Sequence, residues 1–161
     1  MNNKAGIGQS LSEKSAMGVL VILRLVIGYH LLYEGMDKLF NPQWTSAIFL
    51  LQSDWLFAGF FHFLANSPAL LSVVNFINIW GQILIGFSLI LGLFSSKSAI
   101  FGAVMILSYY IAAPPFNGGN IFVDRNLLEF FCLLIIYIFP TGNVLGLDML
   151  IEKYRMQKNG R

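Results

Sequence analysis

The sequence predicts an all-α integral membrane protein whose spans form a four-helix bundle. Of the 161 residues, 57% are hydrophobic and only 11% are charged, whereas about 25% of residues are charged in a typical soluble domain. The mean hydropathy of +0.69 is correspondingly high. Because each bilayer crossing needs about 20 residues, several crossings use most of this length. We therefore expect one membrane domain over residues 1–161.

Four apolar segments account for the predicted spans. They cover approximately residues 17–35, 72–94, 99–113 and 124–139. Pro42, Pro114 and Pro140 follow the first, third and fourth segments, and proline ends a helix because it removes a backbone hydrogen bond. A short polar connection at residues 95–98 requires the second and third spans to run antiparallel.

The distribution of positive charge predicts the orientation. Lysine and arginine residues gather in the N-terminal arm, around Lys97 and in the tail after residue 152, while the opposite loops carry only Lys38 and Arg125. Short loops rich in lysine and arginine remain in the cytoplasm. We expect both termini to be cytoplasmic and the chain to reside in the cytoplasmic (inner) membrane of a bacterium or archaeon.

An aromatic segment separates the first two spans. Residues 44–66 contain two tryptophans and five phenylalanines but no lysine or arginine. We expect two short helices at the outer interface, where tryptophan is enriched and backbone polar groups must be satisfied. A fifth span is the alternative, which Asp54, His62 and the break before Pro68 disfavour.

The C-terminal tail shows helical periodicity. Leu147, Leu150, Ile151 and Tyr154 recur on one face, and charged residues take the other. The tail is therefore expected to form an amphipathic helix on the cytoplasmic membrane surface.

Every predicted span carries polar residues to one outer layer. These are His30, Glu34 and Lys38, then Asn78 and Gln82, then Tyr109 and Tyr110, and finally Arg125, Asn126 and Glu129. Carboxylates, a histidine, amides and phenols can hydrogen-bond a quinone head group and move its protons. We predict catalytic roles for Glu34, Glu129 and His30, and quinone contacts from Gln82, Asn78, Tyr110, Asn126 and Lys38. Alternatively, these groups pair only with one another and with water.

Other cofactors and partners are not expected. The two histidines, His30 and His62, do not lie on two facing core helices, which disfavours haem. His30, Glu34 and Glu129 lack a metal-binding spacing, and the single Cys132 cannot form an intrachain disulfide or CxxC pair. The sequence has no stripe of basic residues, so a nucleic-acid partner is not expected.

Arg24 lies inside the first span, where a charge requires a partner. Gly28, Leu31 and Gly35 follow it on one helical stripe, and the glycines allow a neighbouring helix to approach, so Arg24 should face the bundle. We expect a structural ion pair between Arg24 and Asp148, at the start of the tail. Snorkelling of Arg24 to the inner headgroups is the alternative.

Several motifs resemble the DoxX family. LRLVIGYHLLYEGMDKLFNP at residues 23–42 is similar to the Arg, Gly, Gly, Lys signature that opens its members. Trp80-Gly81 with Gly86 and residues 91–94 resemble the second-helix pattern, and YIAAPPF (110–116), NLLEFF (126–131) and FPTGNVLGLD (139–148) resemble a DoxX subgroup. The resemblance points to Arg24, Gly28, Gly35, Lys38, Trp80, Asn126, Glu129 and Asp148.

The resemblance implies a four-helix membrane bundle associated with quinone chemistry. DoxX takes its name from a subunit of a quinol oxidase, and the related DoxD family contributes to thiosulfate:quinone oxidoreductase. We therefore expect a small membrane subunit of a quinone-linked oxidoreductase, whose partner subunit supplies the electron chemistry. Membrane lipids, quinone and a partner subunit or second copy are the expected partners. The alternative is a non-enzymatic membrane protein that binds or stabilises a partner.

Overall fold

The structure is a computed structural model that describes residues 3–115 and 122–159. The elements in chain order are α1 (Asn3–Phe40), α2 (Ala47–Leu51), α3 (Ala58–Asn66), α4 (Pro68–Leu91), α5 (Ser95–Ala112), α6 (Arg125–Ile138), the 3₁₀ turn η2 (Thr141–Asn143) and α7 (Leu147–Asn159). Over the described ranges all regular secondary structure is helical, which confirms the predicted all-α class. Phe116, the last residue of the YIAAPPF motif, lies outside the described residues.

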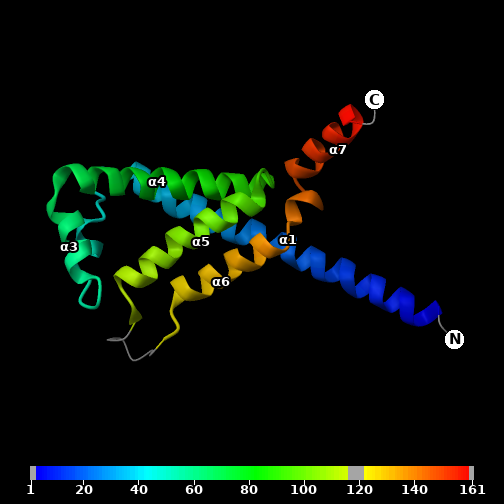
Figure 1. The fold of residues 1–161 in the computed structure, drawn as a ribbon, viewed down its shortest axis with the longest axis horizontal. Helices are drawn as coiled ribbons and strands as arrows, with labels where there is room; N and C mark the ends of the chain where they lie inside the picture. The colour runs from blue at the N-terminus through cyan, green and yellow to red at the C-terminus, as the bar shows by residue number, and fades with distance from the viewer. Residues whose placement is uncertain (1–2, 116–121, 160–161) are drawn as a thin grey trace.

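The four longer predicted helices pack in pairs. α1 lies along α4 and α5 lies along α6, while α4 also contacts α5 and α1 contacts α6 (Figure 1). The buried core between them is apolar and consists mainly of Leu31, Leu89, Ala103, Ile106 and Leu133. This arrangement brings side chains from all four helices to a common interior.

The buried stripe of α1 has the periodicity expected from the sequence. Arg24, Gly28, Leu31 and Gly35 are buried along it, so the prediction that Arg24 faces the other helices is confirmed. An added Cβ atom at Gly28 would lie 3.1 Å from the carbonyl oxygen of Gly86 on α4. Small residues on both helices therefore permit close backbone contact.

The outer surfaces of the long helices are strongly apolar. On α1, Val19, Ile22, Val26, Tyr29 and Tyr33 are all more than half exposed and follow one face. Large exposed apolar patches mark contact with a membrane or another protein. Within the described residues, the 28-residue segment Glu13–Phe40 and the 24 residues of α4 are long and apolar enough to cross a bilayer.

The remaining two predicted spans are shorter helices. α5 has 18 residues and α6 has 14, which gives lengths of about 27 Å and 21 Å at ~1.5 Å per residue. The second predicted span, 72–94, is shifted, because α4 begins at Pro68 and ends at Leu91. Gly92 stops α4 by adopting a left-handed backbone with φ of 61°.

The segments outside these helices follow the sequence prediction in their secondary structure. The aromatic segment forms the two short helices α2 and α3, and the tail forms α7. Figure 1 shows α7 and the beginning of α1 at the end of the molecule opposite α3. The two ends of the chain are therefore on the same side of the paired helices.

Candidate functional site

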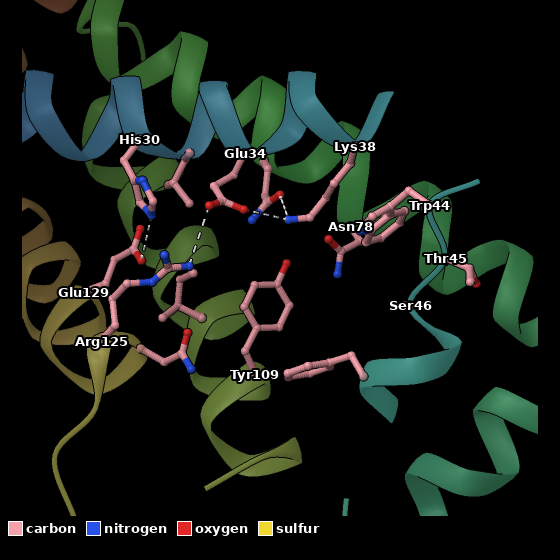
Figure 2. A pocket seen from close by; sticks show the side chains of 15 residues that line it. His30, Glu34, Lys38, Trp44, Thr45, Ser46, Asn78, Tyr109, Arg125 and Glu129 are labelled. Atoms are coloured by element: carbon pink, nitrogen blue, oxygen red, sulfur yellow. Dashed lines mark hydrogen bonds and ion pairs between the residues drawn. The ribbon is translucent and has the colours of Figure 1, made fainter. Parts of the chain in front are cut away.

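A cavity of about 290 Å³ lies among the four longer helices, next to the segment that precedes α2 (Figure 2). Of the eight residues predicted to be catalytic or to contact quinone, all except Tyr110 line it: His30, Glu34, Lys38, Asn78, Gln82, Asn126 and Glu129. The assignment of polar residues to one outer layer of the predicted spans thus identified side chains that the fold brings together.

Glu34 is neutralised by two cations. Its Oε2 atom lies 3.5 Å from Lys38 Nζ, one helical turn away, and its Oε1 atom lies 3.7 Å from Nη2 of Arg125 on α6. Lys38 Nζ also donates a hydrogen bond of 2.5 Å to Gln82 Oε1. These contacts join α1, α4 and α6 around one side of the cavity (Figure 2).

Glu129 has a different environment. Its Oε2 atom lies 3.6 Å from His30 Nε2, and its side chain is only 5% exposed. The two predicted carboxylates therefore do not share a partner: Glu34 is paired with Lys38 and Arg125, whereas Glu129 is paired with His30. His30 is 31% exposed and connects the buried Glu129 with the edge of the site.

Three buried polar atoms in the cavity lining have no hydrogen-bond partner among the residues that the structure describes. They are Asn78 Oδ1, the Tyr109 hydroxyl and Glu129 Oε1. Leaving such an atom unsatisfied costs about 1–3 kcal/mol, and buried polar groups normally have partners. The lining is therefore prepared to hydrogen-bond an occupant.

Tyr110 is the one predicted quinone contact that the structure places elsewhere. Its hydroxyl donates to the carbonyl oxygen of Phe122 at 2.8 Å, whereas the neighbouring Tyr109 lines the cavity. Consecutive residues of a helix point in directions about 100° apart. Since both tyrosines lie at the same depth, only the packing of α5 decides which one faces the cavity.

The roof of the cavity is also absent from the sequence prediction. Trp44, Thr45, Ser46 and Phe49 line it from the segment that leads into α2. Asn75 Oδ1 on α4 fixes this segment by accepting hydrogen bonds from the backbone nitrogen of Ser46 at 2.9 Å and from its hydroxyl at 2.6 Å. In the sequence, the polar pair Thr45-Ser46 inside an aromatic segment was the feature that could have indicated this contact with the cavity.

The hydrogen bonds of Arg24 go to the segment that precedes α7 rather than to Asp148. It is 1% exposed, and it donates to the carbonyl oxygen of Leu145 at 2.6 Å and to Thr141 Oγ1 at 3.3 Å. No ion pair joins Arg24 to Asp148 in the described parts of the chain, so the expected direct pair is not formed.

Asp148 instead caps α5. Its Oδ1 atom accepts from the backbone nitrogen of Phe94 at 2.7 Å, and its Oδ2 atom accepts from the backbone nitrogen and hydroxyl of Ser95 at 3.0 and 2.9 Å. The backbone nitrogen of Asp148 donates to the Gly92 carbonyl oxygen at 2.9 Å. Free N–H groups at the start of a helix attract a carboxylate, which explains why Asp148 turns away from Arg24.

The helices with exposed apolar faces and an internal polar cavity define a small helical membrane protein. The DoxX family model matches residues 19–114, from α1 to the residues that follow α5, and the chain belongs to the DoxX family. No curated protein and no solved structure matches the chain. Arg125, Asn126 and Glu129 lie beyond the matched range, so their association with the site depends on the structure.

Proposed function

We propose that this chain is a small membrane subunit of a quinone-linked oxidoreductase that binds a quinone head group in the cavity described above. In this proposal α1, α4, α5 and α6 form a single membrane domain, a four-helix bundle whose cavity lies in the outer half. The electron donor belongs to a partner subunit. The observation that carries the proposal is that three buried polar atoms without a partner among the described residues belong to the lining of one cavity.

The lining fits a quinone head group in size and chemistry. The cavity of about 290 Å³ has aromatic walls from Trp44, Phe49 and Tyr109, which suit a flat ring. Asn78, Tyr109 and Glu129 supply hydrogen-bonding atoms for ring oxygens. A membrane-embedded site that combines apolar walls with a few convergent polar groups is typical of small-molecule binding.

The charged residues can hold and transfer protons. When bound, a quinone supplies two-electron, two-proton redox chemistry. Glu129 Oε1 is free to hydrogen-bond the ring, and Oε2 contacts His30, which reaches the edge of the site. Glu129 and His30 therefore form a short route for a proton between the cavity and its surroundings. Glu34 holds Lys38 and Arg125 in place.

The proposed topology places both termini in the cytoplasm. It is supported by the common location of α7 and the start of α1 (Figure 1), and by the basic residues at both ends of the sequence. In a variant whose native Cys132 is replaced by serine, a cysteine at Asn159 should react with an impermeant thiol reagent only after the cells are opened. Reaction at Asn159→Cys in intact cells would show that the C-terminus is outside and would overturn this topology.

Quinone extraction tests the proposed function. We expect gently purified protein to retain quinone, counting both redox forms, at close to one molecule per chain. Glu129→Gln should lower this content about tenfold, because it removes a charge-assisted hydrogen bond worth ~1.5–3 kcal/mol. Tyr110→Phe removes a hydroxyl outside the cavity and should leave the content unchanged.

Two other results would count against the quinone site. Equal quinone content in the native protein, Glu129→Gln and Glu34→Gln would show that the bound quinone does not occupy this cavity. Co-purification of an unrelated membrane protein with no quinone at all would support the alternative function of binding and stabilising a partner.

A further inference from the structure

A second hollow lies between α4 and α5, on the outer surface of the paired helices. This α4–α5 groove has a volume of about 660 Å³ and is lined by residues within 77–88 of α4 and 98–108 of α5. Its lining residues Ile77, Leu84, Phe101 and Val104 are each more than half exposed. Because exposed apolar surface of this kind faces the membrane in the proposed topology, the groove opens toward lipid.

The polar side chains of the α4–α5 groove are used within it. The Ser108 hydroxyl donates to the carbonyl oxygen of Met105 at 2.6 Å. The Ser88 hydroxyl donates to the carbonyl oxygen of Leu93 and is also hydrogen-bonded to the Ser98 hydroxyl. The other lining residues are aliphatic or aromatic side chains and one glycine. The chemistry of the groove therefore suits a hydrocarbon chain rather than a polar ligand.

The groove and the cavity meet at the same level of α4 and α5. On α4, Gln82 lines the cavity and its neighbour Gly81 lines the groove. On α5, Tyr109 lines the cavity and its neighbour Ser108 lines the groove. Consecutive residues of a helix point in directions about 100° apart. The polar cavity and the apolar groove therefore lie on the two sides of one seam between these helices.

A flexible side chain closes this seam. An added Cβ atom at Gly81 would lie 3.2 Å from Met105 Sδ, and among the described residues no other atom of a neighbouring helix comes within 4 Å of that position. On the side of α4 that faces α1, by contrast, an added Cβ atom at Gly86 would meet backbone atoms of Gly28 and Leu32. Methionine has three rotatable side-chain bonds and adapts to its neighbours. A chain can thus pass beside Met105 without separating the helix backbones.

The edge of the cavity between α1 and α6 is unsuited to an apolar chain. Glu34 Oε1 and Arg125 Nη2 pair across it at 3.7 Å, and His30 contacts Glu129 beside them (Figure 2). A hydrocarbon chain leaving the cavity here would remove water from these charged groups or separate them, which is unfavourable. The seam between α4 and α5 carries no such penalty.

We infer that the α4–α5 groove holds the hydrocarbon tail of the molecule whose head group occupies the cavity, and that the tail passes between the helices beside Met105. This inference rests on the quinone-linked function proposed above. It adds that the ligand carries a long tail and is dissolved in the membrane, rather than being a small water-soluble ring. From residue 77 to residue 88 α4 rises ~16 Å, so the tail runs from the level of the cavity toward the connection between α4 and α5.

Photolabelling of the full-length protein in lipid nanodiscs tests the inference. The probe is a benzoquinone whose decyl tail ends in a diazirine, used below saturation, and the labelled peptides are identified by mass spectrometry. Specific labelling is the part that an excess of unmodified decyl-benzoquinone suppresses, because random contacts of lipid-facing residues do not saturate. We expect specific labelling on residues 77–88 and 98–108. Glu129→Gln weakens the hold on the head group and should reduce this labelling about tenfold.

A variant that fills the groove tests the role of the tail separately. Gly81→Leu places a side chain against Met105 and should weaken binding of decyl-benzoquinone about tenfold. The same ring with a methyl group in place of the decyl tail should bind within about twofold of its native affinity. Gly18→Leu adds equal bulk where a new Cβ atom has nothing within 4 Å, and should leave both affinities unchanged. Comparing variants in identical nanodiscs cancels the partitioning of the tail into lipid.

The outcomes separate this inference from the function on which it rests. Specific labelling on α1 and α6 beside His30 and Arg125, or unchanged binding of decyl-benzoquinone to Gly81→Leu, would overturn the inference while the quinone site remains. Groove labelling that persists in Glu129→Gln would reveal a lipid site independent of the cavity and would also overturn it. No specific labelling anywhere would overturn both proposals. Labelling of the native protein decides the question even if Gly81→Leu fails to fold.

A second copy of the chain is the competing occupant of the groove. In a variant whose native Cys132 is replaced by serine, Val104→Cys places a thiol at the groove lining. We expect oxidation to leave this variant monomeric. A disulfide-linked dimer would show that a second copy covers the groove, and would overturn the inference without touching the cavity.

Discussion

Replacing Gly86 with alanine should lower the free energy of unfolding by about 2–3 kcal/mol, within the range for overpacking a close contact. The added Cβ atom would lie 2.6 Å from the carbonyl oxygen of Gly28 and 2.8 Å from the Cα atom of Leu32. Both are backbone atoms of α1, which cannot move aside as a flexible side chain can. α1 and α4 would have to separate. Unfolding in mixed micelles, followed by circular dichroism, measures the loss.

Gly18→Ala is the matched control for this prediction. Gly18 lies on α1, the helix that Gly86 of α4 contacts, and an added Cβ atom there has nothing within 4 Å. Alanine favours the helix over glycine by roughly 0.5–1 kcal/mol, so this variant should be as stable as the native protein or slightly more stable. Equal stability of the Gly86 and Gly18 variants would mean that α1 and α4 are not in close contact.

Asp148→Ala should be about as damaging, with a loss of roughly 3 kcal/mol in the free energy of unfolding. The substitution removes the acceptor for two backbone N–H groups and one hydroxyl at the start of α5. The first residue before that helix, Phe94, offers no side-chain cap of its own. The loss can be measured by the same unfolding experiment.

Two further variants show whether the loss comes from capping. Asp148→Asn keeps one acceptor oxygen but places an amide donor where the second oxygen was, so its stability should fall between those of Asp148→Ala and the native protein. Glu152→Ala removes an exposed carboxylate from the same helix and should change stability by less than about 0.5 kcal/mol. Equal losses for Asp148→Ala and Glu152→Ala would exclude the capping role.

Periodicity within a single helix was the most reliable information in the sequence. The stripe of Arg24, Gly28, Leu31 and Gly35 could be identified because a helix repeats every 3.6 residues, and the structure buries all four residues. The depth of polar residues in each span was similarly informative, since it assigned His30, Glu34 and Glu129 to one outer layer before any contact between helices was known. It did not give the pairing, because Glu129 was expected to face Glu34 with His30 beneath, and the structure pairs it with His30.

Contacts that depend on the rotation of one helix about its axis were not predictable. Tyr109 and Tyr110 are equivalent in depth and in chemistry, and the packing of α5 against its neighbours distinguishes them. The same limit applies to Arg24, which donates to the backbone carbonyl oxygen of Leu145. Every residue has a carbonyl oxygen, so the sequence cannot indicate which one accepts. A carboxylate at Asp148 was therefore a reasonable but incorrect choice of partner.

The capping of α5 by Asp148 has a consequence for the order in which the protein can assemble. Phe94 and Asp148 are separated by 54 positions, so the ribosome must synthesise α5, α6 and the following turn before the carboxylate exists. Until then the first N–H groups of α5 have only water or lipid headgroups as partners. The start of α5 therefore receives its cap only after the final segment of the chain has been synthesised, and this segment then fixes the connection between α4 and α5.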